Sequence, residues 1–151
     1  MIKVYITGRL KNKHIKALIE EYLKRSRLKI KLVETKDNKG QTAREVIKLD
    51  SKHQLEFINK QKSALSIALD EHGEKFTSRE FARFIKDIMQ DFKTIAFIIG
   101  GPFGLAKEVK NSCDKTISLS KLTFTHELAA LLLIEQLYRA ETILKNLPYH
   151  K

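Results

Sequence analysis

The sequence predicts one α/β domain over residues 1–151, with a mainly parallel sheet and helices on both faces. Segments with a strand pattern alternate with segments of helical periodicity along the whole chain, which is typical of parallel α/β folds. The segment Thr94–Gly100 is apolar on both of its faces, as expected of a central parallel strand. The chain has 151 residues without a linker, repeat or low-complexity stretch, so we expect a single core.

The first two fifths of the chain predict two strands and two helices. Ile2–Thr7 is rich in β-branched residues, as strands are, and Lys13–Ser26 has apolar residues at helical spacing. Leu28–Glu34 alternates apolar and polar residues, which favours a strand near the edge of the sheet. A polar loop over residues 35–41 leads into a helix over Thr42–Gln61.

The rest of the chain predicts three strands and three helices. Ala64–Asp70 is expected to be a strand that ends in an acidic loop. Thr77 and Glu80 fit a capping box, which opens a helix that continues through Phe92. The remaining elements keep the alternation: a strand over Thr94–Gly100, a short helix from Leu105, a strand over Lys115–Ser120 and a long helix from Thr125 to about Asn146.

Positive charge is concentrated at the N-terminal end. The net charge is +11, and residues 1–62 hold 17 Lys and Arg against 7 Asp and Glu, whereas residues 63–151 hold 12 against 11. This asymmetry favours a polyanionic partner for the N-terminal part, with RNA or DNA ahead of a membrane surface. The alternative is a generally lysine-rich protein whose helices are solvated by Lys side chains. That alternative explains the lysine count better than the asymmetry.

Several protein classes are disfavoured by the composition. Cys113 is the only cysteine, so we expect no disulfide scaffold. The longest apolar run, Leu128–Ile134, is far shorter than the ~20 residues that span a bilayer, and the first ten residues do not resemble a signal peptide. We therefore expect a cytoplasmic protein that is not in a membrane. The histidines and carboxylates show no metal-ligand spacing, so we expect no metal.

The ends of three predicted strands are candidates for a binding site, because ligands of open α/β sheets bind outside the carboxyl ends of the strands. These ends are Leu69–Asp70, the glycine loop Gly100–Gly104 and the loop Leu119–Phe124. Asp70 either contacts a ligand or only caps its own loop. The glycine spacing matches neither a dinucleotide fingerprint nor a phosphate-binding P-loop. The glycine loop either brings its main chain close to a ligand or forms only a tight turn.

The loop Leu119–Phe124 combines Ser and Thr with apolar side chains. Such a loop can offer main-chain groups to a heterocycle between apolar walls, or it can lead into the last helix with Thr125 as its N-cap. Both interpretations can hold together. His126 at the start of that helix favours a structural or capping role, and His150 lies in an apolar C-terminal tail, Leu147–Lys151.

Three stretches of the sequence resemble a known family. "FIIGGPFGL", "SLSKLTFTHELAALLLIEQLYRA" and the closing "YHK" are similar to the ribosomal RNA large subunit methyltransferase H family, of the SPOUT class of RNA methyltransferases. The resemblance covers essentially the whole chain. It implies a SPOUT-like α/β fold with a C-terminal trefoil knot, a homodimer and S-adenosylmethionine as the methyl donor. It also implies N3-methylation of a pseudouridine in helix 69 of 23S rRNA, with the assembled ribosome as the expected substrate.

The sequence departs from the family pattern at two positions. Phe103 stands in the glycine loop where relatives often carry a polar residue, which leaves the wall on the substrate side of the pocket open to question. Thr125 stands where relatives carry proline before the histidine, although Thr is a competent N-cap.

Roles for individual residues follow from the resemblance for donor binding, from the N-terminal charge for RNA contacts, and from the composition of the tail for catalysis. We hypothesise that His150, or a neighbouring group of the tail, approaches the donor site of the other subunit and acts in catalysis. Arg139 would contact RNA or stabilise the dimer. The donor-binding residues would be Leu69, Gly100, Leu119, Ser120, Lys121, Leu122, Thr123 and Phe124. The N-terminal residues expected to contact RNA phosphates are Arg9, Lys11, Lys13, Lys16, Lys24, Arg25, Arg27 and Lys29.

Other functions stay open at this point. A SPOUT-fold methyltransferase that acts on tRNA and a non-catalytic RNA-binding dimer of the same fold are the two alternatives. A plain nucleotide-binding α/β protein is disfavoured by the absent phosphate motifs. The catalytic base and the form of the substrate, free RNA or assembled ribosome, are also left open by the sequence.

Overall fold

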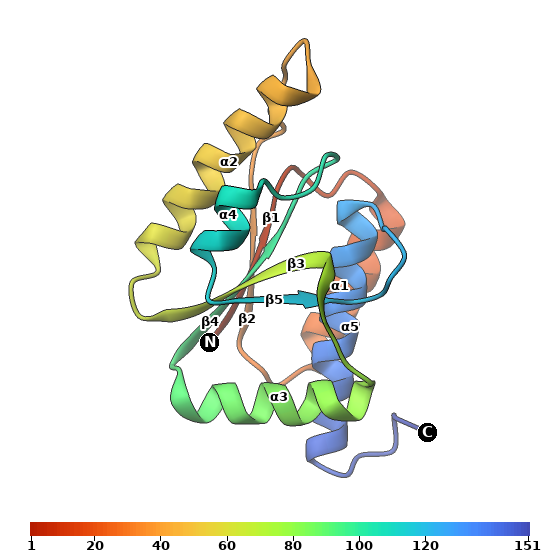
Figure 1. Cartoon of the computed structure of the whole chain (residues 1–151). Coiled ribbons are helices and arrows are strands. Elements are labelled where there is room, and N and C mark those ends of the chain that lie inside the picture. The colour runs from red at the N-terminus through yellow and green to blue at the C-terminus, as the bar shows by residue number, and fades with distance from the viewer.

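The computed structural model describes residues 1–151 as one α/β domain around a five-stranded sheet (Figure 1). The strand order is β2-β1-β4-β3-β5 and every neighbouring pair is parallel, which confirms the predicted fold class. The trefoil knot stays a prediction. The strands are β1 (Ile2–Ile6), β2 (Ile30–Glu34), β3 (Ala64–Lys75), β4 (Thr94–Ile99) and β5 (Lys115–Ser118). The helices are α1 (Lys13–Arg25), α2 (Ala43–Lys60), α3 (Ser78–Asp91), α4 (Lys107–Ser112) and α5 (His126–Leu144).

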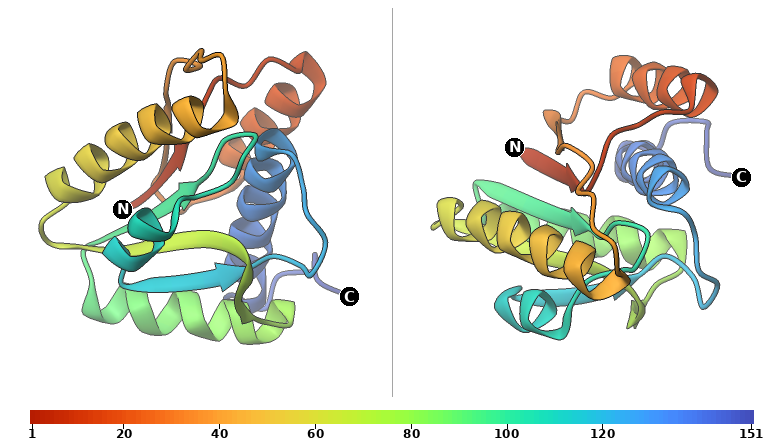
Figure 2. Two further views of the ribbon diagram at one scale, coloured as in Figure 1. Left: turned by 45° about the horizontal axis from the view of Figure 1, so that its top comes forward. Right: turned by 90° about the horizontal axis from the view of Figure 1, so that it is seen from above.

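Helices cover both faces of the sheet, as Figure 2 shows for α1 and α5 on one side and α2 and α4 on the other. The larger hydrophobic cluster, which includes Val4 and Leu133, packs α1, α3 and α5 on one face. The smaller cluster, which includes Tyr5 and Val109, packs α2 and α4 on the other. β4 lies between these clusters at the centre of the sheet, so Ile95–Ile99 are all buried. Burial on both faces explains why this strand is apolar throughout.

The alternating segment forms an edge strand, as predicted. β2 pairs only with β1. The side chains of Lys31 and Glu34 are exposed, whereas Leu32 and Val33 are partly buried. Leu32 packs against the larger hydrophobic cluster and Val33 against the smaller one, on opposite faces of the sheet, whereas the polar side chains of β2 meet solvent.

β3 is longer than the sequence predicts. The expected strand ended at Asp70, but β3 continues to Lys75, and its ladder with β5 resumes after a bulge at Glu74 and Lys75. Leu69 and Glu74 both pair with Ile117 of β5, so the residues between them leave the ladder. Gly73 allows this course, because a Cβ atom there would lie 2.5 Å from the carbonyl carbon of Ile117. Pairing with β5 therefore overrides the acidic, loop-like composition of the segment.

Four of the five helices begin within one residue of the predicted start, whereas α4 begins at Lys107, two residues after the expected Leu105. The Thr77 hydroxyl accepts the amide of Glu80, and the Glu80 carboxylate accepts the amide of Thr77, which completes the capping box before α3. The Thr125 hydroxyl accepts the amide of Leu128 at 3.3 Å, so Thr125 is the N-cap of α5. None of the helices is long and apolar enough to cross a membrane.

Candidate functional site

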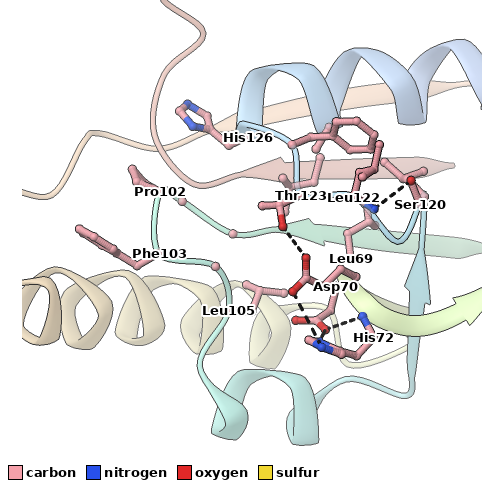
Figure 3. Close-up of a pocket in the computed structure, with 18 of the residues that line it drawn as sticks. Leu69, Asp70, His72, Pro102, Phe103, Leu105, Ser120, Leu122, Thr123 and His126 are labelled. Carbon is pink, nitrogen blue, oxygen red and sulfur yellow. Dashed lines mark hydrogen bonds and ion pairs between the residues drawn. The ribbon is translucent and has the colours of Figure 1, made fainter.

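The three predicted strand ends meet at one cavity of about 490 Å³ (Figure 3). Leu69 and Asp70 lie where β3 enters its bulge, and the glycine loop Gly100–Gly104 follows β4. The loop Leu119–Phe124 follows β5, and His126 comes from the start of α5. Small-molecule sites commonly enclose about 300–1,000 Å³, so the cavity can hold a ligand of cofactor size.

Seven of the eight residues predicted to bind the donor line this cavity. The exception is Lys121, whose side chain is exposed and outside the lining. A role for these residues in donor binding stays a prediction. The seven are Leu69, Gly100, Leu119, Ser120, Leu122, Thr123 and Phe124.

The glycine loop closes tightly on itself. Gly101 and Gly104 form an antiparallel bridge, and the Gly104 amide donates to the Gly101 carbonyl at 3.0 Å. Pro102 occupies the second position of this four-residue turn, where its fixed φ is favourable. A Cβ atom on Gly100 would lie 2.6 Å from the carbonyl carbon of Gly104. The loop is therefore a tight turn with bare main chain at the cavity wall.

The main chain of the loop Leu119–Phe124 is largely free of internal hydrogen bonds. Two of its groups have partners within the protein. The Ser120 carbonyl accepts the Ser118 hydroxyl at 2.7 Å, and the Leu122 amide donates to the Ser120 hydroxyl at 3.1 Å. Main-chain amides and carbonyls are obligatory hydrogen-bonding groups. This loop therefore offers several of them to water or to a ligand in the cavity.

Asp70 organises a charged cluster at the cavity. Its Oδ1 accepts the main-chain amide of His72 at 3.0 Å, and its Oδ2 accepts Lys110 Nζ at 3.0 Å. Burial would raise the pKa of Asp70, but these hydrogen bonds outweigh it and lower the pKa from 3.8. No sequence pattern pointed to Lys110, because its approach to Asp70 depends on how α4 packs. No group of three or more His, Cys, Asp or Glu side chains is placed to hold a metal ion.

Two contacts at the rim join segments that are distant in sequence. The Thr123 hydroxyl donates to the Glu71 carboxylate, which links the loop after β5 to the bulge of β3. His126 Nε2 lies 3.5 Å from the carbonyl oxygen of Arg9, which brings the loop after β1 to the start of α5. His126 lines the cavity as well as opening the helix, so its position goes beyond the structural or capping role that the sequence favoured.

The C-terminal tail packs beside the C-terminal half of α5, away from the loop that opens the helix (Figure 1). The Tyr149 hydroxyl donates to Glu135 Oε1 at 3.0 Å, and the Arg139 guanidinium carbon lies 4.7 Å from the centroid of the Tyr149 ring. His150 Nδ1 lies 3.3 Å from Arg139 Nη1. Arg139 follows His126 by 13 residues on one helix, a rise of about 20 Å. His150 therefore does not line the cavity of its own chain.

The N-terminal residues predicted to contact RNA all have exposed side chains on α1 and its flanking segments. Arg139 differs, because it is partly buried and its Nη2 lies 2.5 Å from Glu135 Oε1. The hydrogen bonds that Arg139 donates to the Glu135 carboxylate raise the pKa of Arg139. The charge of Arg139 is thus paired within the chain, and its predicted contact with RNA or a partner subunit stays a prediction. The exposed set is Arg9, Lys11, Lys13, Lys16, Lys24, Arg25, Arg27 and Lys29.

A parallel sheet whose strand ends enclose a small-molecule cavity defines a ligand-binding α/β domain. The family model described as "Predicted SPOUT methyltransferase" matches residues 1–150, which places this domain in the SPOUT class. Proteins called ribosomal RNA large subunit methyltransferase H are similar over nearly their whole length. Those of Kosmotoga olearia and Dictyoglomus thermophilum are each 39% identical, over 158 and 155 residues, and that of Thermotoga neapolitana is 33% identical over 151. Each alignment covers 99% of this chain and 98% of the relative.

The chain belongs to the ribosomal RNA large subunit methyltransferase H family, which confirms the resemblance of its sequence. Solved structures support the fold alone. A probable methylase family protein from Haemophilus influenzae Rd KW20 has a TM-score of 0.58 at 13% identity, with 96% of this chain and 66% of that one covered. The chain thus spans just under two thirds of that protein. A tRNA (m1G37) methyltransferase from Aquifex aeolicus has a TM-score of 0.51 at 15% identity, with 91% and 69% covered.

Proposed function

We propose that this protein transfers a methyl group from S-adenosylmethionine to N3 of a pseudouridine in helix 69 of 23S rRNA. It would act in the cytoplasm, on the assembled ribosome and as a homodimer. Methylation of large-subunit rRNA is supported by the names of the relatives. The observation that carries the proposal here is the cavity where the three predicted strand ends converge.

The residues of the cavity fit S-adenosylmethionine in three respects. The volume of about 490 Å³ suits a ligand of that size. The unpaired main-chain groups of Leu119–Phe124 can bond the edge of the adenine, while Leu69, Leu119 and Leu122 supply apolar walls. The lining holds the carboxylates of Asp70 and Glu71 and the Lys110 ammonium that pairs with Asp70, so the charge of Glu71 remains to favour a cationic ligand. S-adenosylmethionine, when bound, supplies a methyl group on a positively charged sulfur.

The exposed basic residues support an RNA substrate. Arg9 belongs to this set, and its carbonyl oxygen lies 3.5 Å from His126 at the cavity rim. The basic surface therefore begins beside the cavity and continues over α1. Lys and Arg side chains that neutralise phosphates supply a large, sequence-independent part of nucleic-acid affinity. We infer that α1 and its flanks hold the RNA while the acceptor base reaches the cavity.

The tail would supply the base from a second subunit. N3 of the acceptor bonds to the methyl carbon as the carbon–sulfur bond breaks, and the N3 proton must leave to a base or to solvent. His150 is the candidate for that base, but it lies about 20 Å along α5 from its own cavity. A homodimer that brings the tail of one subunit to the cavity of the other would remove this obstacle.

The proposal is tested by transfer of labelled methyl groups to three substrates. Ribosomes from cells that lack the protein, the same 23S rRNA freed of protein, and total tRNA would each be incubated with the pure protein and S-adenosylmethionine. We expect label in 23S rRNA of the ribosome. Label in tRNA alone would support the tRNA alternative. Absence of label, together with absence of donor binding by calorimetry, would support a non-catalytic RNA-binding protein.

A further inference from the structure

Phe103 is the most exposed aromatic residue of the chain. It is 52% exposed, and the next, Phe92, is 37% exposed. Phe103 belongs to neither hydrophobic cluster and pairs with no other aromatic ring. A single exposed apolar side chain is ordinary, but Phe103 lines the mouth of the candidate site. Its ring projects from the glycine loop at the outer edge of the cavity (Figure 3).

The turn that carries Phe103 has a restricted main-chain conformation. Gly101 and Gly104 are bridged, with a hydrogen bond of 3.0 Å between their main chains. Pro102 restricts φ immediately before Phe103. The main chain that carries the ring is therefore ordered before any ligand binds. Because this loop does not have to be ordered on binding, a ligand that stacks on the ring would bind with little entropic cost from the loop.

The surroundings of Phe103 favour a nucleic-acid base over an apolar partner. Figure 3 places Leu122, which is 70% exposed, on the other side of the cavity from Phe103. Lys121 is exposed next to Leu122 in the chain, and Arg9 is exposed beside the rim. Apolar platforms interspersed with cations are the surface on which single-stranded nucleic acids bind, because bases stack while phosphates are neutralised.

We propose that Phe103 stacks against an unpaired nucleobase of the RNA substrate at the mouth of the cavity. This inference rests on the proposed RNA substrate, but it assigns Phe103 to the acceptor and not to the donor. An enzyme that modifies a base must take that base out of its stack and hold it in a pocket. The stack on Phe103 would replace part of the stacking that the base loses in the RNA.

Three variants at this position test the contact by kinetics. Phe103→Ala should lower kcat/KM for ribosomes by about 5- to 150-fold, the loss of one base–aromatic stack, mainly through KM. The dissociation constant of S-adenosylmethionine, measured by calorimetry, should not change. Phe103→Trp and Phe103→Tyr should restore kcat/KM, because the stacking surface returns. Phe92→Ala is the matched control, since Phe92 is also an exposed phenylalanine but is outside the cavity lining. Wild-type kcat/KM in Phe103→Ala would overturn the inference.

Crosslinking identifies what the ring touches. Benzoylphenylalanine placed at position 103 should crosslink on illumination to 23S rRNA in ribosomes, at or next to the methylated nucleotide, and the same group at position 92 should not. Crosslinking to a second copy of the chain would place Phe103 in a protein interface and overturn the inference. If the wild type transfers methyl groups but position 103 gives no RNA crosslink, the stacking inference would be contradicted while the proposed function would stand. An RNA crosslink with no methyl transfer by the wild type would support the stacking while contradicting the proposed function.

Discussion

Gly100 and Gly104 approach so closely that a Cβ atom on Gly100 would lie 2.6 Å from the carbonyl carbon of Gly104 and 2.8 Å from its oxygen. Both contacts are with main chain, which cannot swing aside as a side chain can. The shape of the glycine loop therefore depends on the missing side chain of Gly100. Because this loop forms one wall of the cavity, ligand binding depends on it too.

Gly100→Ala should weaken donor binding. The added methyl group would force the loop to shift, and overpacking of this kind costs about 1–3 kcal/mol of stability. We expect the dissociation constant of S-adenosylmethionine to rise about 10-fold or more, a free-energy loss of about 1.4 kcal/mol, in a calorimetric titration. Lys107→Ala is the control, because Lys107 is exposed just after the loop and does not line the cavity. Unchanged donor affinity in Gly100→Ala would exclude the glycine loop as a wall of the donor site.

His150→Ala should lower methyl transfer by about 100-fold or more if His150 is the base, with little change in donor binding. Deletion of Tyr149–Lys151 should do the same. The deletion also removes the Tyr149 contacts with Glu135 and Tyr22, so its unfolding temperature should be measured in parallel. Lys151→Ala is the control for the tail. Full activity in the deletion variant would show that the tail takes no part in catalysis.

Mixing two impaired variants tests whether the tail acts between subunits. The His150→Ala variant has an unaltered cavity, and the Gly100→Ala variant has an unaltered tail. In a symmetric dimer that contains one copy of each variant, the unaltered cavity would meet the unaltered tail. At an S-adenosylmethionine concentration far below its dissociation constant, we expect about a quarter of wild-type activity after the variants are unfolded and refolded together, whereas each variant refolded alone keeps about a tenth or less. No recovery in the mixture would argue that the tail does not cross to the partner.

RNA binding should depend strongly on salt through the basic residues of α1. Replacement of Lys13, Lys16 and Lys24 by Ala should reduce the slope of log affinity against log salt by about 2 to 3, because each phosphate contact contributes about 0.7 to 0.9. The control removes the same charge elsewhere, by Ala at the exposed Lys86, Lys93 and Lys115. Equal slopes in both triple variants would mean that net charge, and not the surface of α1, attracts the RNA.

Glu141 should contribute stability that is lost in acid. Its Oε2 accepts the Ser26 hydroxyl at 2.7 Å and the Arg27 amide at 2.9 Å, which ties the end of α1 to α5. Burial would raise the pKa of Glu141, but bonds from Lys145, Ser26 and Arg27 lower it below 4.5. A lowered pKa stabilises the fold above the unfolded-state pKa, and the gain disappears as pH falls through the folded-state pKa.

Glu141→Gln should therefore lower the free energy of unfolding at pH 7 by about 1–3 kcal/mol. The difference from the wild type should begin to shrink as pH falls below about 4.5, the unfolded-state pKa, and disappear below the lowered folded-state pKa, where the carboxylate is protonated in both states. Urea unfolding at a series of pH values measures this directly. Glu20→Gln is the control, because Glu20 is exposed on α1. A constant difference across the whole pH range would show that charge on Glu141 is not what stabilises the fold.

The sequence predicted the parts of the fold that depend on local pattern. Thr94–Gly100 is central because it is apolar on both faces, and Thr125 caps α5 because its hydroxyl reaches the first turn. The predicted length of β3 was wrong, because the segment after Asp70 is held by pairing with β5 and not by its own composition. The two paired segments are distant in sequence, so the pairing cannot be read from the residues of either segment alone.

The site, too, could be predicted from the sequence only in part. The segments that form the cavity were predicted correctly because the carboxyl ends of parallel strands meet at one edge of a sheet. Lys110 reaches Asp70 only because α4 packs beside β3, and His126 reaches the rim only because the loop after β1 lies against α5. Such contacts between distant elements depend on packing, which the periodicity of residues does not specify.

The central claim is that this protein methylates N3 of one pseudouridine in 23S rRNA, and nucleoside mapping tests it most directly. 23S rRNA from cells with and without the protein would be digested, and the fragment containing helix 69 examined by mass spectrometry. We predict one N3-methylated pseudouridine in helix 69 that disappears when the gene is deleted and returns with the wild-type gene, but not with His150→Ala. Identical methylation of 23S rRNA in both strains would contradict the account.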